Sequence, residues 1–338
     1  MRKQNIIPLF LLLLITACIS SCEKYFFVEE PKDDPEAIFE NFWRAYNENY
    51  SVFEERNVNW QELYAINRPL INSNTTEDEL YAVITSMLAP LNDGHVQFIA
   101  EGRTVFYSNI YYNNRIDDDL FDKEVIKTNY LDNGYTSNDA YIYGSINSEI
   151  AYLYLPYIAD NMPVLNDVLD EYSSTKGLIV DLRHNSGGDF TWALSSLNRL
   201  TDQKRFVFTS RTKNGTGIND FTDWYDWYLE PGGNYYDKPV VLLTDRYTIS
   251  AGERTTMMFM QLPNVTIIGD TTNAAHSTLF TGQLANGWFY SLSTQEVKLP
   301  DGISYEGIGL APHIYIKNDL IELQSGIDRV LEEAISKF

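Results

Sequence analysis

Cysteine is nearly absent from this chain of 338 residues, which has two, Cys18 and Cys22, both near the N-terminus. No cysteine follows Cys22, so disulfide bonds cannot stabilise the folded part of the chain. Basic residues are also scarce, with 25 Lys and Arg against 47 Asp and Glu, for a formal net charge of −22. Because binding to nucleic acid needs a basic surface, nucleic acid is excluded as a partner.

The apolar stretch 6–15 is too short to span a bilayer comfortably. It follows Arg2-Lys3 and precedes small residues and both cysteines, which is typical of a targeting segment. This segment resembles a bacterial lipoprotein signal, in which a cysteine after small residues is acylated and becomes the N-terminus. Both Cys18 and Cys22 fit the pattern. We expect Cys22, which gives a signal peptide at 1–21 and an acidic tether at 22–34.

An ordinary secretory signal is the alternative interpretation of the same segment. Both interpretations predict export, and with a lipid anchor we expect the protein in the bacterial cell envelope. The lipoprotein interpretation adds a lipid anchor, in the outer membrane or at the cell surface.

Helical patterns dominate residues 35–95. Asp34 followed by Pro35 is a typical helix start, and Ile38, Phe39, Phe42, Trp43 and Tyr46 recur at helical spacing. Two capping boxes, at 59–62 and 76–79, predict two further helices. We therefore predict a small helical domain at 35–95, followed by a larger domain at 96–338. The three-helix unit at 35–90 is predicted to have no chemistry of its own.

In the larger domain, apolar strands alternate with helices, which predicts an α/β fold with a mostly parallel sheet. Two of these strands, at 178–182 and 239–243, lead into Gly187-Gly188 and Ser250. Chemistry in such folds belongs at the carboxyl ends of the strands, where both features fall.

Ser250 lies in the turn 248–253, between an apolar strand and a helix. A serine there lies beside unpaired backbone N–H groups, and the small residues Ala251 and Gly252 leave room for a substrate carbonyl. The turn therefore suits a nucleophile. The alternative is an ordinary helix N-cap.

His95 follows an Asp-Gly turn that ends the helical domain, and an exposed turn histidine is the alternative to a functional one. We interpret the acidic run 117–119 as a solvated turn, because the spaced ligands of a calcium loop are missing. The segment 212–231 is interpreted as a surface excursion that forms a wall or lid of a cleft. No metal or cofactor is predicted.

Four segments, 91–96, 178–188, 238–253 and 306–312, together resemble the tail-specific, or C-terminal-processing, serine peptidases. The resemblance is to the branch that includes the tricorn protease core and the interphotoreceptor retinoid-binding proteins. It implies a ClpP/crotonase-like (ββα superhelix) catalytic domain at 96–338. It also implies Ser250 as nucleophile, His95 as general base and Glu306 as the residue that orients the base. Oxyanion donors are then Ala251 N–H and the N–H of Gly187 or Gly188.

Two features depart from the family pattern. Many members use a Ser-Lys dyad, but the stretch 269–276 contains no lysine, so that mechanism cannot operate here. Many members also carry a PDZ domain, and the roughly 55 residues between His95 and Ile150 are too few for one. His276 is the alternative base, yet it falls one place past the lysine position. We expect it to be a cleft-wall or surface residue.

The sequence thus predicts an exported, lipid-anchored serine endopeptidase or oligopeptidase that acts on a peptide or protein substrate through an acyl-enzyme. A non-catalytic protein that binds peptides or hydrophobic ligands on the same fold is the alternative. The oligomeric state is not predicted.

Overall fold

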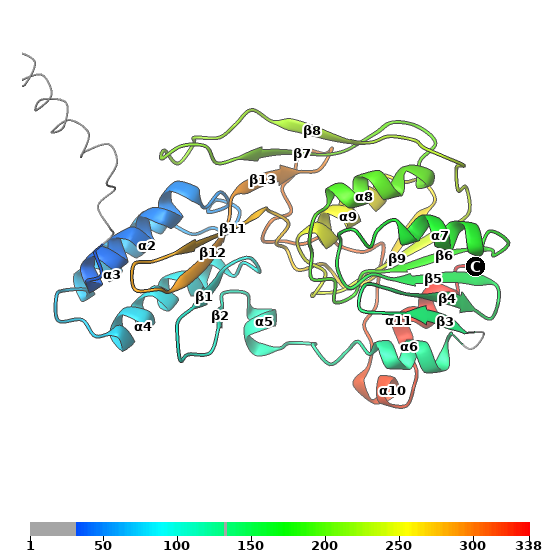
Figure 1. Cartoon of the computed structure of the whole chain (residues 1–338), viewed down its shortest axis with the longest axis horizontal. Coiled ribbons are helices and arrows are strands. Elements are labelled where there is room, and N and C mark those ends of the chain that lie inside the picture. The colour runs from blue at the N-terminus through cyan, green and yellow to red at the C-terminus, as the bar shows by residue number, and fades with distance from the viewer. Residues whose placement is uncertain (1–31, 132–133) are drawn as a thin grey trace, which may run out of the picture.

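The computed structural model describes residues 32–131 and 134–338. The predicted signal peptide, both cysteines and most of the predicted tether therefore lie outside the described residues. Figure 1 shows two lobes joined by a ribbon of strands. None of the helices in these two ranges is both long and apolar enough to cross a membrane.

Three helices form the outer layer of the N-terminal lobe, and their starts agree with the predicted caps. Asp34 accepts the N–H of Ala37 at the first start, and Thr76 and Glu79 form a complete capping box at the third. The helices are α2 (Pro35–Asn49), α3 (Trp60–Asn67) and α4 (Glu77–Leu88), followed by single turns at Arg68–Leu70 and Ala89–Leu91.

An antiparallel sheet in the order β11-β12-β1-β2 forms the inner layer of this lobe. Its strands are β1 (Gln97–Ile99), β2 (Phe106–Tyr107), β11 (Leu279–Gln283) and β12 (Phe289–Ser293). Phe98 and Leu292 share one buried core with Phe42 of α2. The predicted boundary at residue 95 cuts through this core, because the apolar faces of the helices are covered by strands from two distant parts of the chain.

A seven-stranded sheet in the order β14-β10-β9-β6-β5-β4-β3 forms the centre of the C-terminal lobe. Five neighbouring strands of this sheet, β14, β10, β9, β6 and β5, run parallel to one another. Strand β4 pairs antiparallel with β5, and β3 pairs antiparallel with β4. Their bounds are Tyr135–Ser137 (β3), Ile142–Ile146 (β4), Ile150–Tyr154 (β5), Gly177–Asp181 (β6), Val240–Thr244 (β9), Val265–Gly269 (β10) and Ile314–Tyr315 (β14). This is the mostly parallel α/β sheet that the sequence predicted.

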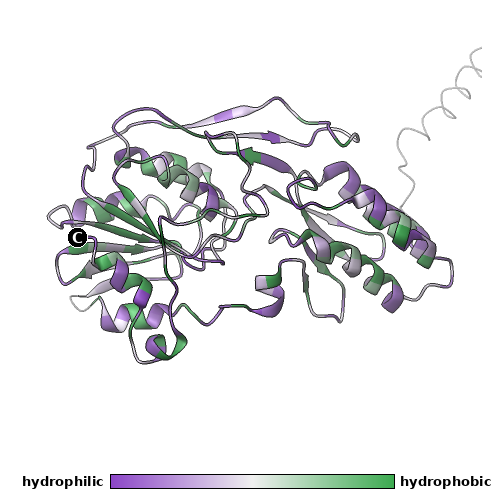
Figure 2. Ribbon diagram, turned by 180° about the vertical axis from the view of Figure 1, so that it is seen from behind, coloured by the Kyte–Doolittle hydropathy of each residue, from purple (hydrophilic) through white to green (hydrophobic). Residues whose placement is uncertain are grey.

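Helices cover both faces of this sheet, so every residue of its inner strands β6 and β9 is buried (Figure 2). Val180 and Leu242 point into the core beneath α7, α8 and α9, while Ile179 and Val241 point into the core beneath α6 and α11. The helices are α6 (Lys123–Asn129), α7 (Val164–Glu171), α8 (Thr191–Ser196, continued by a turn at Leu197–Leu200), α9 (Ala251–Phe259), α10 (Leu320–Gln324) and α11 (Arg329–Ile335).

A third, three-stranded sheet runs along one side of both lobes (Figure 1). It consists of β7 (Arg205–Thr212), β8 (Tyr225–Leu229) and β13 (Gln295–Lys298). The predicted surface excursion 212–231 thus contains a strand of this sheet. Between β1 and β5, β2, the short helix α5 (Ile110–Asn114), α6, β3 and β4 account for the described part of the chain, and no PDZ domain is evident there.

Candidate active site

A sharp turn connects strand β9 to helix α9 and places Ser250 at the junction. Ser250 has φ 58° and ψ −119°, a backbone conformation that costs a non-glycine residue about 1–3 kcal/mol. Its side chain makes no capping hydrogen bond to α9, so the N-cap alternative does not explain the serine. Its backbone N–H donates to Ala275 O at 2.9 Å, and Thr248 Oγ1 donates to Leu182 O at 2.7 Å. The turn is therefore fixed on both sides, while the hydroxyl of Ser250 has no hydrogen-bond partner among the described residues.

The glycine pair after β6 lies directly against this turn. A Cβ added to Gly187 would be 2.6 Å from the Cβ of Ser250, and one added to Gly188 would be 2.0 Å from Ile158 O. Both glycines also have positive φ, of 87° and 133°. No other residue type can bring the backbone so close to Ser250.

The two glycine N–H groups differ in availability. Gly187 N–H donates to the side chain of Asn185 at 3.0 Å, so it is occupied. Within 32–131 and 134–338, neither Gly188 N–H nor Ala251 N–H has a protein acceptor. The free pair of donors beside Ser250 is therefore Gly188 with Ala251.

His95 reaches the same place from the N-terminal lobe. Its backbone N–H donates to Asp93 Oδ1 at 2.8 Å, which closes the Asp-Gly turn. A Cβ on Gly94 would lie 2.4 Å from Ile249 Cδ1 and 2.4 Å from Asn273 Oδ1, so the absence of a side chain there lets the two turns touch.

One pocket of about 430 Å³ is shared by His95 and Ser250. Its lining residues are Gly94, His95, Gln97, Tyr107, Tyr112, Ser186, Gly188, Ile249, Ser250 and Leu279. No hydrogen bond joins the imidazole and the hydroxyl among the described contacts. Such bonds commonly tighten only when substrate binds.

The imidazole of His95 is buried, with 3% of the residue exposed, so the expected alternative of an exposed turn histidine is wrong. Burial lowers its pKa to about 4, while Asp93 acts in the opposite direction. Nε2 has no partner in the described structure, and Nδ1 lies 3.4 Å from Ser293 Oγ. The ring is therefore neutral at neutral pH, and Nε2 is uncommitted among the described residues.

The carboxylate nearest to the Nδ1 side of this ring is that of Asp93, and not that of Glu306 as we expected. Ser293 Oγ donates to Asp93 Oδ2 at 2.8 Å, and Tyr50 Oη donates to the same oxygen at 2.9 Å. Asp93 thus reaches His95 through Ser293. No periodicity or motif in the sequence singles out Tyr50 or Ser293.

Glu306 lies in the same buried region with different partners. Its Oε1 accepts from Arg56 Nη2 at 2.8 Å, and its Oε2 accepts from the backbone N–H of His276 at 3.0 Å. The expected direct contact between Glu306 and His95 is missing from the described hydrogen bonds. Burial raises the pKa of Glu306 to about 8, against the opposing effect of the Arg56 guanidinium.

Arg56 follows α2 and binds three separate segments around the site. Besides Glu306, it donates to the backbone oxygens of Asn92 and Ala274, and Asp93 Oδ1 lies 3.6 Å away. The helical unit, for which we predicted no chemistry of its own, thus supplies a buried cation next to Asp93 and Glu306. A lone arginine between helices carries no sequence signal of this role.

His276 is completely buried, which corrects the expectation of a cleft-wall or surface residue. Its Nε2 lies 3.4 Å from Glu306 Oε2 and its Nδ1 lies 4.0 Å from Glu253 Oε1. Burial lowers its pKa well below the ordinary value, and Arg254 and Arg56 act in the same direction. His276 does not line the pocket that contains Ser250.

Glu253, one helical turn after Ser250, holds the loop that carries His276. It is buried and accepts hydrogen bonds from Thr272 Oγ1 and from the backbone N–H groups of Ala274 and Ala275. Burial raises its pKa to about 7. The same loop supplies the oxygen of Ala275 that accepts Ser250 N–H, so Glu253 supports the turn of Ser250 indirectly.

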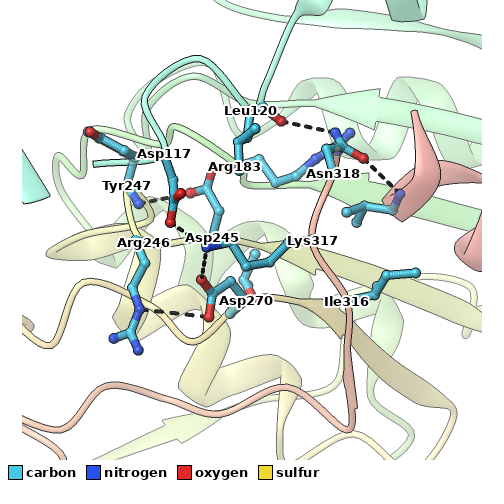
Figure 3. A pocket seen from close by; sticks show the side chains of 12 residues that line it. Asp117, Leu120, Arg183, Asp245, Arg246, Tyr247, Asp270, Ile316, Lys317 and Asn318 are labelled. Atoms are coloured by element: carbon cyan, nitrogen blue, oxygen red, sulfur yellow. Dashed lines mark hydrogen bonds and ion pairs between the residues drawn. The ribbon is translucent and has the colours of Figure 1, made fainter. Parts of the chain in front are cut away.

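A second cavity opens at the same edge of the sheet, but its charges satisfy one another (Figure 3). Lys317 lies between Asp117, with which it pairs, and Asp270, whose Oδ2 is 3.8 Å from its Nζ. The acidic run 117–119 is thus partly ion-paired rather than simply solvated. The cavity holds about 30 Å³, which is room for a water molecule and not for a peptide.

Comparison with known proteins shows the family to which the chain belongs. The sequence profile of Peptidase family S41 matches residues 149–316, and that of the Tricorn protease C1 domain matches residues 31–89. The chain belongs to peptidase family S41.

This S41 family member is similar to a solved structure from Parabacteroides merdae, provisionally assigned as a peptidase. The two share 27% sequence identity and a TM-score of 0.79, over 90% of this chain and 96% of the other. A lipoprotein from Streptococcus agalactiae has the same fold, with 19% identity and a TM-score of 0.56 over 90% of this chain and 99% of the other.

Two curated relatives of this S41 family member match at lower coverage. A carboxy-terminal-processing protease from Bartonella bacilliformis is 27% identical over 47% of this chain and 35% of its own length. A nisin-resistance protein from Lactococcus lactis is 26% identical over 42% of this chain and 46% of its own length. The matched region thus spans less than half of either relative.

Proposed function

We propose that this S41 family member is an exported serine peptidase that hydrolyses peptide bonds through an acyl-enzyme on Ser250. The observation that carries the proposal is the strained turn of Ser250, which faces one pocket together with the neutral imidazole of His95. Strain of this kind persists at functional sites, and a hydroxyl held free of capping bonds is available as a nucleophile.

In the proposed mechanism, His95 Nε2 takes the proton of Ser250 as Oγ attacks the scissile carbonyl. The oxyanion that forms accepts hydrogen bonds from the N–H groups of Gly188 and Ala251. His95 then gives the proton to the leaving amine, and a water molecule, activated by the same imidazole, hydrolyses the ester. The absence of a lysine from 269–276 is consistent with a histidine base.

Asp93 takes the orienting role that we expected for Glu306. Acting through Ser293, it fixes the ring and stabilises the imidazolium that forms during acylation. Glu306 acts one step further away, by holding Arg56 against the turn that carries His95.

Export and a lipid anchor at Cys22 complete the proposal. The targeting segment at 1–21 supports them, as does the fold shared with a streptococcal lipoprotein. Endopeptidase or oligopeptidase activity on peptides and proteins fits an open pocket of about 430 Å³.

A fluorophosphonate probe, which reacts with activated serines, tests the proposal. We expect the purified chain to be labelled, and the label to disappear in Ser250→Ala, while Ser186→Ala, a change at another serine lining the pocket, keeps it. A chain that is folded yet never labelled, and that cleaves no member of a peptide library, would instead be a binding protein on this fold.

A further inference from the structure

An exposed apolar surface adjoins the pocket of Ser250 and His95. It is a shallow groove of about 300 Å³ on the sheet of the N-terminal lobe, referred to below as the apolar shelf. The shelf is lined by Gln97, Ile99, Leu279, Thr281, Phe289, Tyr290 and Ser291. Three large apolar side chains on it are strongly exposed, with Ile99 at 42%, Leu279 at 42% and Phe289 at 46%.

The pleat of β1 explains why Ile99 of the shelf and Gln97 of the active-site pocket lie on one face. Side chains two residues apart share one face of a strand, so Gln97 and Ile99 point to the same side, while Phe98 between them points into the buried core. Ile99 is paired across the strands with Phe289, which extends the apolar surface onto β12.

The shelf is continuous with the proposed active-site pocket. Gln97 and Leu279 line both hollows, so a chain that leaves the pocket on this side passes directly over the shelf. Ile99 lies one pleat, about 7 Å, beyond Gln97, which matches the spacing of alternate side chains in an extended peptide.

The chemistry of the shelf selects apolar side chains. None of its seven lining residues is charged, although the chain as a whole carries a formal charge of −22. A charged substrate side chain would lose hydration there without gaining a partner, whereas an apolar side chain would remove Ile99 and Phe289 from water.

We infer that the apolar shelf is a substrate subsite that binds a large aliphatic or aromatic side chain of an extended peptide, a few residues from the scissile bond. This inference rests on the proposed peptidase function, because the occupant is the chain that continues out of the pocket of Ser250. It makes Ile99 and Phe289 specificity-determining residues without a part in the chemical steps.

The test compares the wild type with the double variant Ile99→Ser/Phe289→Ser. The matched control is Ile66→Ser/Ile321→Ser, which changes two exposed apolar residues outside both hollows. Each protein digests the same proteome-derived peptide library, and mass spectrometry gives the frequency of Leu, Ile, Phe and Met at each position around the cleaved bonds. Fluorophosphonate labelling of Ser250 is measured in parallel.

We expect the wild type and the control to favour large apolar side chains at one position within about four residues of the cleaved bond. In the Ile99→Ser/Phe289→Ser variant, the preference should fall by about tenfold, while the labelling rate of Ser250 stays within about twofold. Labelling and cleavage with the same preference in the variant, or with no preference in the wild type, would overturn the subsite and leave the peptidase in place.

Absence of labelling and cleavage in the wild type would overturn the proposed function itself, and the subsite with it. Analytical ultracentrifugation of the same proteins measures their oligomeric state and so tests whether a second copy of the chain occupies the shelf. If the shelf variant changes only the oligomeric state, the shelf binds a second copy of the chain and the subsite is refuted.

Discussion

Arg56 Nη2 donates a hydrogen bond of 2.8 Å to Glu306 Oε1, which joins two buried side chains 250 positions apart in the sequence. The pair connects the N-terminal lobe to the loop before β14. Because Arg56 also donates to Asn92 O, the pair anchors the turn that presents His95. Loss of Glu306 would still leave Arg56 beside the buried carboxylate of Asp93, 3.6 Å away, but it would remove a buried hydrogen bond of the guanidinium, which typically costs about 1–3 kcal/mol. We therefore expect substitution of Glu306 to lower the stability of the fold more than it lowers activity.

A comparison of two carboxylate variants distinguishes the residue that orients His95 from the residue that holds Arg56 in place. We expect Asp93→Asn to lower kcat by about 100-fold or more, because it removes the anion behind His95. It should also move the acid limb of kcat/KM to lower pH, since Asp93 raises the pKa of that imidazole. Glu306→Gln should cost only about tenfold in kcat while lowering the melting temperature more. Steady-state kinetics across pH and thermal unfolding provide both readouts, with Ser293→Ala expected to resemble Asp93→Asn in milder form.

The reverse pattern would restore Glu306 as the orienting residue. In that case Glu306→Gln would shift the acid limb and Asp93→Asn would leave it in place.

The choice of base is tested by two histidine variants. His95→Ala should lower turnover by at least about 1,000-fold with the fold intact by circular dichroism, because the proton acceptor for Ser250 is lost. His276→Ala should keep turnover within about tenfold of the wild type and instead cost about 1–3 kcal/mol of stability, as it empties a buried position. Equal damage to turnover by His276→Ala and Ser250→Ala, with an active His95→Ala, would assign the base to His276.

The close approach of Gly187 to Ser250 predicts a selective effect of one methyl group. Gly187→Ala places a Cβ 2.6 Å from the Cβ of Ser250, so the nucleophile must move, and we expect a loss of about 100-fold or more in kcat/KM. Gly302→Ala is the matched control, because Gly302 has a similar φ of 81° and its added Cβ meets nothing within 4 Å. Both variants carry the same backbone strain, so kinetics that differ between them report the contact with Ser250. Similar kinetics would show that the contact is unimportant.

The pH dependence of the reaction follows from the burial of His95. Burial disfavours the charged imidazolium and lowers the pKa to about 4, from an ordinary value of 6.5. The base is neutral and competent above its pKa, so activity should persist as pH falls through 6.5 and be lost only at lower pH. We expect the acid limb of kcat/KM at about pH 4–5, measured at constant ionic strength, and an acid limb near 6.5 would contradict the buried state of this ring.

Stability should decline over the same acid range. The unfolded chain binds a proton at His95 below about pH 6.5, whereas the folded chain resists it until about pH 4. This group therefore contributes stability above pH 6.5 that is lost as pH falls toward 4. Unfolding by urea at several pH values, compared with His95→Ala, isolates its share.

The proposed anchor predicts a change in partitioning. An acylated Cys22 should hold the expressed protein in the membrane fraction, and Cys22→Ser should release it to the soluble fraction. Cys18→Ser is the control and should leave the protein in the membrane. Release by Cys18→Ser alone would assign the anchor to Cys18.

Local patterns in the sequence were enough to predict the elements that carry the reactive groups. The caps of α2 and α4 depend on residues three apart. The apolar runs of β6 and β9 follow from burial of both faces of these strands, so caps and strands alike can be recognised in a short window. The carboxyl ends of those strands then place Gly187, Gly188 and Ser250 at one edge of the sheet.

Contacts between distant segments decided the rest, and no local pattern encodes them. Closure of the helical lobe by β1 and β12 brought Ser293 behind His95, and the loop after α2 brought Arg56 to Glu306. Which carboxylate faces the imidazole is therefore a matter of packing. The sequence by itself determined which residues are available for the chemistry. Only the tertiary structure decided their partners, because burial forces each polar group to pair with whatever neighbour the packing provides.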